Sequence, residues 1–150
     1  MGCDLHASME VLFDGKWFCI GALDSDRNYS LFGKLSGVRG EDDEPFFEVG
    51  GELPDDVTDE VRADYGEWGD DAHSLTIVDY RGLEEFCKHF RKPTKRWSSI
   101  SRADRGLWRG GKKEFDLFFA ASYVNDWLSI ARKFIEIGAE DVRIVIWYDN

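Results

Sequence analysis

Apolar and polar residues at the start of the chain follow the pattern of a β-hairpin. Two apolar runs flank Asp14-Gly15, a dipeptide typical of tight hairpin turns. The last residues are apolar at consecutive positions, as in a strand covered on both faces at the centre of a sheet. The pattern predicts strands at residues 3–13, 16–22, 74–78 and 142–148.

Between these strands, apolar residues recur at the spacing of amphipathic helices. The predicted helices are 28–35 with Asn28 or Asp26 at its cap, a short acidic helix that begins at Pro54, a helix that begins after Asp79 and ends before Pro93, and 114–137. Strand-rich ends around a helical middle predict an α+β fold. We expect one domain, residues 1–150, with a small, mostly antiparallel sheet that includes both terminal strands and helices packed on one face.

Both predicted terminal strands carry polar groups that a core strand does not need. Because side chains alternate along a strand, Asp4 and His6 point to one face and Cys3 to the other. If the last strand runs antiparallel beside the first, Asp149 lies next to Asp4, with their Cα atoms within about 10 Å. Two carboxylates that close need a compensating group. We therefore expect a metal ion, a polar ligand or an arginine between them.

This polar cluster is the candidate site. Asp4, His6 and Asp149 could ligate a metal ion, with Asn150 as a fourth oxygen donor, and a mixed carboxylate and imidazole set suits Mn²⁺, Fe²⁺ or Zn²⁺. In a catalytic interpretation, Asp4, His6 and Asp149 hold metal or catalytic water and His73 is the acid or base. Two alternatives stay open: a polar ligand bound without catalysis, or a polar strand face in contact with water.

The net charge of −11 argues against direct nucleic-acid binding, which needs a positive surface. The charge is unevenly distributed. Residues 41–71 contain 14 acidic side chains and one base, Arg62, whereas residues 88–113 contain 10 Lys or Arg and one acid, Asp104. These segments are either solvated faces that partly neutralise each other, or one of them is a docking surface.

The basic stretch contains the spacing Gly-x4-Gly-Lys, from Gly106 to Lys112, directly before the longest predicted helix. It departs from a phosphate loop because Lys113 stands where a Mg²⁺-binding hydroxyl is needed, and no apolar strand precedes it. Lys112 and Lys113 are therefore predicted to bind an anion at a helix N-terminus, with a solvated loop as the alternative.

Other sequence features bound the class of protein. No stretch approaches the roughly 20 apolar residues of a membrane helix, and the first residues lack the pattern of a signal peptide. Three cysteines without Cys-x-x-Cys spacing fit reduced thiols. We expect a soluble, cytoplasmic protein with no membrane partner.

The chain opens with Met-Gly-Cys-Asp-Leu-His and closes with Val-Arg-Ile-Val-Ile-Trp-Tyr-Asp-Asn. Between them it carries Arg-Asn-Tyr-Ser-Leu-Phe at residues 27–32, Gly-Val-Arg at 37–39, Leu-Pro-Asp-Asp at 53–56 and Trp-Gly-Asp-Asp-Ala-His-Ser at 68–74. In these segments it resembles a family of small bacteriophage and prophage proteins with no settled function, with Leu5 in place of the usual Ile and Tyr148 in place of the usual Phe. The resemblance implies a phage origin, with the host cytoplasm as its location. It points to the polar positions Cys3, Asp4, His6, Arg27, Arg39, Asp71, His73, Asp149 and Asn150.

Two functions fit these features. In the first, the terminal site binds or hydrolyses a phosphorylated small molecule such as a nucleotide, with Arg27 and Arg39 on the anion. In the alternative, the protein is a non-enzymatic inhibitor whose acidic segment 41–71 imitates nucleic acid. Its target would then be a host defence nuclease, such as a CRISPR or restriction complex.

Overall fold

The computed structural model describes residues 2–40, 44–88 and 112–150, without the side chains of residues 112–116. Its elements are β1 (Leu5–Phe13), β2 (Lys16–Ala22), α1 (Tyr29–Ser36), α2 (Asp59–Trp68), a 3₁₀ turn (Gly69–Asp71), β3 (His73–Asp79), α3 (Tyr80–Lys88), α6 (Lys112–Glu136) and β4 (Asp141–Tyr148). The basic loop and the Lys112 and Lys113 side chains lie outside the described residues, so the anion site stays a prediction.

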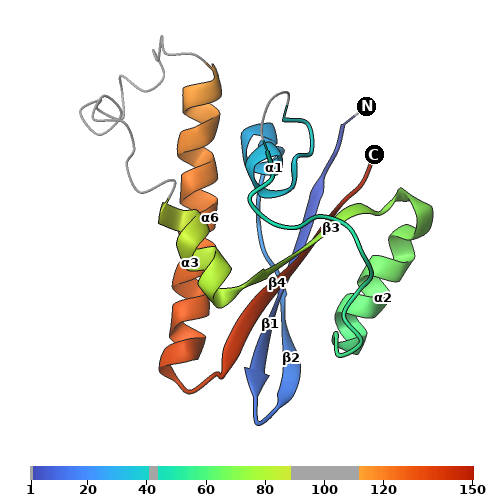
Figure 1. The fold of residues 1–150 in the computed structure, drawn as a ribbon, viewed down its shortest axis with the longest axis vertical. Helices are drawn as coiled ribbons and strands as arrows, with labels where there is room; N and C mark the ends of the chain where they lie inside the picture. Colours follow the sequence, from blue (N-terminus) through green and yellow to red (C-terminus); the bar gives the residue numbers. More distant parts are fainter. Residues whose placement is uncertain (1, 41–43, 89–111) are drawn as a thin grey trace.

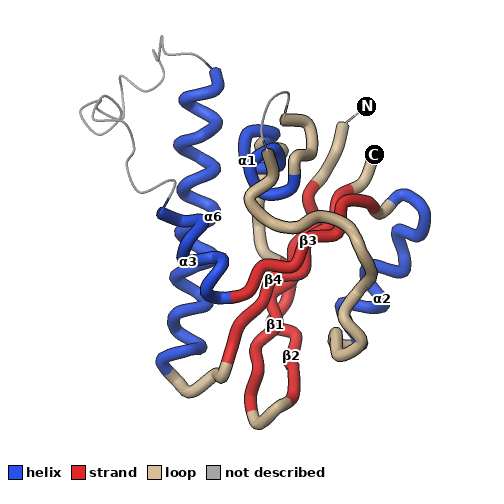
Figure 2. Tube along the Cα trace, viewed as in Figure 1, coloured by secondary structure: helices blue, strands red, loops and turns tan. Residues whose placement is uncertain are grey.

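The four strands form one antiparallel sheet in the order β2-β1-β4-β3 (Figures 1 and 2). The two terminal strands pair directly, with Leu5 opposite Tyr148 and Leu12 opposite Asp141. β4 therefore lies in the interior of the sheet, as its continuous apolar sequence predicts, and both chain ends lie at the same end of the sheet (Figure 1). The α+β fold with both terminal strands in the sheet is confirmed.

Three helices, α1, α3 and α6, pack on one face of the sheet. Their apolar side chains form the main core with alternate residues of β1 and β4, including Met9, Ile144 and Ile146. The other face is covered by α2 and the segment before it, through a smaller core of Val57, Val61, Leu75, Val145 and Trp147. The helices predicted to pack on one face are α1, α3 and α6, and α2 adds a second, thinner layer on the other face.

Local sequence signals explain the element ends. The hairpin turn places Asp14 at φ 50° and Gly15 at φ 72°, the left-handed conformations that a two-residue hairpin needs. The side chain of Asn28 caps α1 by accepting a hydrogen bond from Leu31 N at 2.9 Å. α2 begins at Asp59 and not at Pro54, because Pro54 starts a separate turn and Thr58 supplies the cap.

Within residues 2–40, 44–88 and 112–150, no helix is both long and apolar enough to cross a membrane. The longest helix in these ranges, α6, is 25 residues long and contributes Ala120, Val124, Trp127 and Leu128 to the main core. Packing on the sheet therefore accounts for part of its apolar surface, whereas Phe119 and Ile130 stay exposed.

Candidate functional site

The two chain ends meet as the sequence predicts. Asp149 N donates a hydrogen bond to Asp4 O at 3.2 Å, and Asp4 N donates to Asp149 Oδ1 at 3.0 Å. Because directly paired residues of antiparallel strands have Cα atoms about 5 Å apart, the expected proximity of Asp4 and Asp149 is confirmed. The second oxygen of Asp149, Oδ2, lies 3.0 Å from His6 Nε2.

Arg27 supplies the expected arginine partner at this end of the sheet. Its Nε and Nη2 donate to Asp4 Oδ1 and Oδ2 at 2.5 and 2.9 Å, a bidentate pair. The hydrogen bond from Arg27 holds the pKa of Asp4 below its usual value, and Asp4 in turn raises the pKa of Arg27. Arg27 therefore already neutralises Asp4, and an anion would have to compete with that carboxylate to bind Arg27.

His6 lies between two tryptophan rings. Its ring centroid is 4.4 Å from that of Trp68 and 5.7 Å from that of Trp147, with Trp147 nearly parallel to it. His6 Nδ1 has no hydrogen bond to a described residue and is not among the buried unpartnered atoms, so it faces solvent. Asp149 orients the imidazole through Nε2, which leaves Nδ1 able to accept or donate a proton.

His73 lies on the other face of the sheet. It pairs with Tyr148 of the main core and stacks on that ring at 6.1 Å, whereas His6 pairs with Trp147 of the smaller core. Its Nδ1 lies 2.9 Å from Ser74 Oγ. The structure therefore does not bring the two histidines into one site, and the predicted partnership of His73 with Asp4 and His6 is corrected.

Cys3 and Arg39, like His73, lie toward the face of the sheet that α1, α3 and α6 cover. Cys3 is fully buried in the main core, on the face opposite to that of Asp4 and His6, as the alternation of side chains predicts. Burial raises the pKa of its thiol, and the nearby Arg39 guanidinium partly counteracts that rise. Arg39 lies 6.0 Å from the ring centroid of Tyr29. A buried thiol with a raised pKa is a poor nucleophile, so this pair does not add a reactive cysteine to the site.

The metal ligands expected at the chain ends already have partners within the protein. No three His, Cys, Asp or Glu side chains within the described residues are arranged to hold a metal ion. Asp4 is paired with Arg27, and Asp149 accepts from His6 and Asp4 N, while Asn150 is exposed. The carboxylates of Asp4 and Asp149 are thus engaged by protein donors, and a metal ion bound by the predicted set of Asp4, His6, Asp149 and Asn150 would have to displace those donors.

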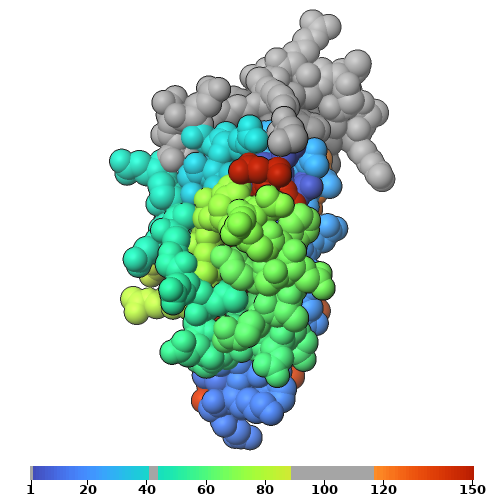
Figure 3. All heavy atoms as spheres, turned by 90° about the vertical axis from the view of Figure 1, so that its right-hand side faces the viewer, coloured from blue at the N-terminus to red at the C-terminus, as the bar shows by residue number. Residues whose placement is uncertain are grey.

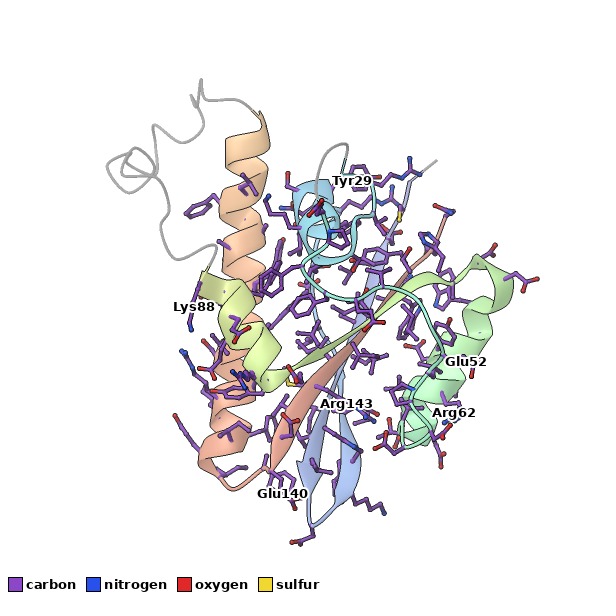
Figure 4. The ribbon with its side chains drawn as sticks, viewed as in Figure 1. Tyr29, Glu52, Arg62, Lys88, Glu140 and Arg143 are labelled. Carbon is purple, nitrogen blue, oxygen red and sulfur yellow. The ribbon has the colours of Figure 1, made fainter. Side chains whose placement is uncertain are left out.

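A second polar cluster, not predicted from the sequence, lies farther along β1. Glu10 is fully buried and accepts hydrogen bonds from Arg143 Nε and Thr58 N, both at 2.7 Å. Arg143, labelled in Figure 4, also donates to Asp56 Oδ1 at 2.8 Å and lies 3.9 Å from the ring centroid of Trp17. This cluster ties the segment before α2 to the sheet.

A cavity of about 450 Å³ opens beside this cluster, between β2 and the start of α2. It is lined by residues 15–19 and 56–60. Cys19 lies half-buried in its wall, where burial raises the pKa of the thiol. The cavity is therefore bounded by the hairpin turn and β2 on one side and by Asp56, Asp59 and Glu60 near the start of α2 on the other.

The face formed by α2 and its flanks is acidic. Figure 3 looks onto this face, and Figure 4 labels Glu52 and Arg62 on it. We call its exposed carboxylates the acidic layer: Glu52, Asp55, Asp56, Asp59, Glu60, Asp64, Glu67, Asp70 and Asp71. Arg62 is the one Lys or Arg in this range, and its Nη2 lies 3.3 Å from Asp55 O. The layer therefore carries nine carboxylates against one base.

Replacing Arg27 by glutamine should raise the pKa of Asp4 toward its usual value near 3.9, because the main cause of the depression is removed. A depressed carboxyl pKa stabilises the fold above the unfolded-state pKa, and that contribution is lost as pH falls through the folded-state value. The Asp4 carboxyl can be followed by ¹³C NMR titration, with Asp79 as an internal reference far from Arg27. An unchanged Asp4 titration would contradict the ion pair.

The expectation of a phage origin stays an expectation from the quoted residues, and the function is inferred from the placement of side chains. No protein-family model, no curated protein and no solved structure matches this chain.

Proposed function

We propose that this protein is a non-enzymatic acidic inhibitor whose acidic layer occupies the nucleic-acid-binding surface of another protein. The observation that carries the proposal is the arrangement of nine exposed carboxylates against one base on the α2 face. Complementary charge of this kind directs association and selects a basic partner. The expected phage origin makes a host defence nuclease, such as a CRISPR or restriction complex, the first target to test.

The charge density of the layer supports imitation of a nucleic-acid strand. α2 has ten residues and is about 15 Å long at 1.5 Å per residue. It carries Asp59, Glu60, Asp64 and Glu67, or about one carboxylate per 4 Å, close to the one phosphate per 3.4 Å of a DNA strand. The pairing of Arg62 with backbone carbonyls draws its guanidinium toward the segment before α2.

The layer is also held in a fixed position. Arg143 binds both the side chain and the backbone carbonyl of Asp56, at 2.8 and 3.2 Å. Thr58 N is bound by Glu10, and Trp17 Nε1 donates to Asp56 Oδ2 at 3.0 Å. A preorganised surface loses less entropy on binding than a mobile one, which favours a tight complex. Asp56 therefore supports the layer from within as well as adding to its charge.

Neutralising the acidic layer should abolish inhibition. The test variant combines Asp55→Asn, Glu60→Gln, Asp64→Asn and Glu67→Gln, and the matched control combines Asp24→Asn, Glu85→Gln, Asp126→Asn and Glu136→Gln, all at exposed positions. Cleavage of labelled DNA by restriction and CRISPR nucleases is measured with increasing inhibitor. We expect half-inhibition to require at least about tenfold more of the test variant than of the unmodified protein. Close charge pairs at an interface each contribute roughly 1.5 kcal/mol or more, which is about tenfold in affinity.

The control separates surface position from net charge. It carries the same change in charge on the side of α1, α3 and α6, and it should inhibit like the unmodified protein. Inhibition should also weaken steeply as salt is raised. Equal potency of the test variant and the unmodified protein would contradict the proposal, as would equal loss in both variants.

The second candidate function is polar ligand binding or acid–base chemistry at the chain ends, on a phosphorylated small molecule such as a nucleotide. The observation in its favour is the His6–Asp149 pair, with Nδ1 of His6 open to solvent. A double variant, Asp4→Ala with His6→Ala, distinguishes the two functions. It should leave nuclease inhibition intact, whereas it should abolish nucleotide binding or hydrolysis if the terminal site acts.

A further inference from the structure

β2 is an edge strand with an open side. The sheet order ends with β2, and among the described residues no strand pairs with its outer edge. Unpaired backbone groups on such an edge can accept a further strand from a partner. The hairpin that presents the edge is fixed at its turn, where Gly15 N donates to Glu140 Oε1 at 3.1 Å (Glu140 is labelled in Figure 4).

The two faces of β2 differ in chemistry. Phe18 and Ile20 point to one face and are 45% and 43% exposed, which is unusual for large apolar side chains on adjacent same-face positions. Trp17 and Cys19 point to the other face, toward the cavity beside α2. A strand added to β2 would therefore meet an apolar surface on one side and the cavity on the other.

The cavity side is acidic. Asp59 and Glu60 are exposed at its rim, while Asp56 is engaged by Arg143 and Trp17. Lys16 lies on the same face as Phe18, with its Nζ 5.4 Å from the Phe18 ring centroid. Lys16 also lines the cavity, but its Nζ lies near the apolar side of β2, and the carboxylates of Asp59 and Glu60 outnumber it at the rim.

We propose that β2 binds an extended segment of the partner by strand addition, and that this segment alternates apolar and basic side chains. The apolar side chains pack on Phe18 and Ile20, and the basic ones reach Asp59 and Glu60 across the cavity. The need for a basic partner rests on the proposed function. A second copy of this chain is disfavoured as the occupant, because it would bring the same carboxylates against each other.

The probes are two synthetic peptides of about ten residues with the same composition of Arg, Lys, Val and Thr, long enough for one strand. In one the basic and apolar residues alternate, and in the other they are grouped in blocks. Titration is followed by amide NMR of residues 16–22. We expect the alternating peptide to bind about tenfold more tightly and to shift the β2 amides, because backbone pairing and alternate side-chain positions both contribute.

A pair of variants tests the apolar contact. Phe18→Thr with Ile20→Thr keeps strand propensity and should weaken the alternating peptide about fivefold or more. The matched control, Phe119→Gln with Ile130→Gln, removes apolar side chains of similar exposure from α6 and should bind like the unmodified protein. Circular dichroism confirms that both variants fold.

The outcomes separate this inference from the proposed function. Equal affinity for both peptides, with shifts spread over the acidic layer, would overturn strand addition while leaving an acidic docking surface. Binding of neither peptide would also overturn the inference, while nuclease inhibition tests the proposed function independently. Concentration-dependent dimerisation through β2 in sedimentation runs without peptide would overturn it in favour of self-association.

Discussion

Replacing Arg143 by methionine is expected to lower the free energy of unfolding by about 3–5 kcal/mol, the usual cost of leaving one partner of a buried ion pair unpaired. Glu10 is fully buried, and Arg143 is the cation that contacts it among the described residues. The change also removes two hydrogen bonds to Asp56 and the cation–π contact with Trp17. The loss should appear as a lower urea midpoint.

Two further variants identify the cause. Glu10→Met with Arg143→Met removes both charges and should recover part of the loss, because no charge is left buried without a partner. Arg132→Met is the control, since Arg132 is about half exposed and lies 3.7 Å from Glu84, a surface pair worth about 0–1 kcal/mol. If the double variant is less stable than Arg143→Met, Glu10 stabilises the fold without Arg143, through its hydrogen bond with Thr58 N, and the unpaired charge is not the cause of the loss.

The pairing of Glu10 with Arg143 could have been predicted from the sequence, although it was not. In an antiparallel pair the residue numbers of opposite partners keep a constant sum, so the register that brings Asp149 to Asp4 also brings Arg143 to Glu10. The alternation of β1 correctly places Glu10 on the face of Asp4 and His6. The sequence pattern did not indicate that α2 covers that face, and so it gave no sign that Glu10 is buried.

Other features depend on local signals that can be recognised without the fold. The hairpin at Asp14-Gly15 and the Asn28 cap follow from turn chemistry, and the structure confirms them. Periodicity predicts the four strands but not all of their ends, because β1 begins at Leu5 and not at residue 3. The position of α2 does not follow from its own sequence. Val57 and Val61 indicate a buried side, but only Trp147 and Val145 of β4 determine which face of the sheet that side covers.

Part of the candidate site could likewise be predicted from the sequence, and part of it could not. Strand pairing brings Asp4, His6 and Asp149 together, which the patterns of the two terminal strands predict. Arg27 comes from the loop after β2, and nothing in its spacing indicates that it would pair with Asp4. His73 departs from expectation because its strand pairing with Tyr148 fixes its face, and the neighbouring Ser74 has a φ of 55° where the ladder shifts.

Trp147 connects the candidate site, the acidic layer and the sheet. Its side chain is fully buried, lies 5.4 Å from the Tyr65 ring of α2 and is stacked on His6. Replacing Trp147 by alanine should lower the free energy of unfolding by about 3–5 kcal/mol, because it removes a large buried ring and leaves a cavity. The local stability of α2 should decrease most, because α2 packs on the sheet partly through this ring.

Hydrogen exchange measures that distribution directly. In the Trp147→Ala variant, the amides of α2 should exchange faster by a larger factor than those of α3 and α6, which pack on the opposite face. Trp68→Ala is the matched control, because Trp68 also contacts His6 but is only half-buried, and its effect should be smaller. Uniform acceleration across all helices would mean that α2 unfolds only with the whole domain. The acidic layer would then be as rigid as the core, and loss of inhibition by Trp147→Ala would reflect global unfolding.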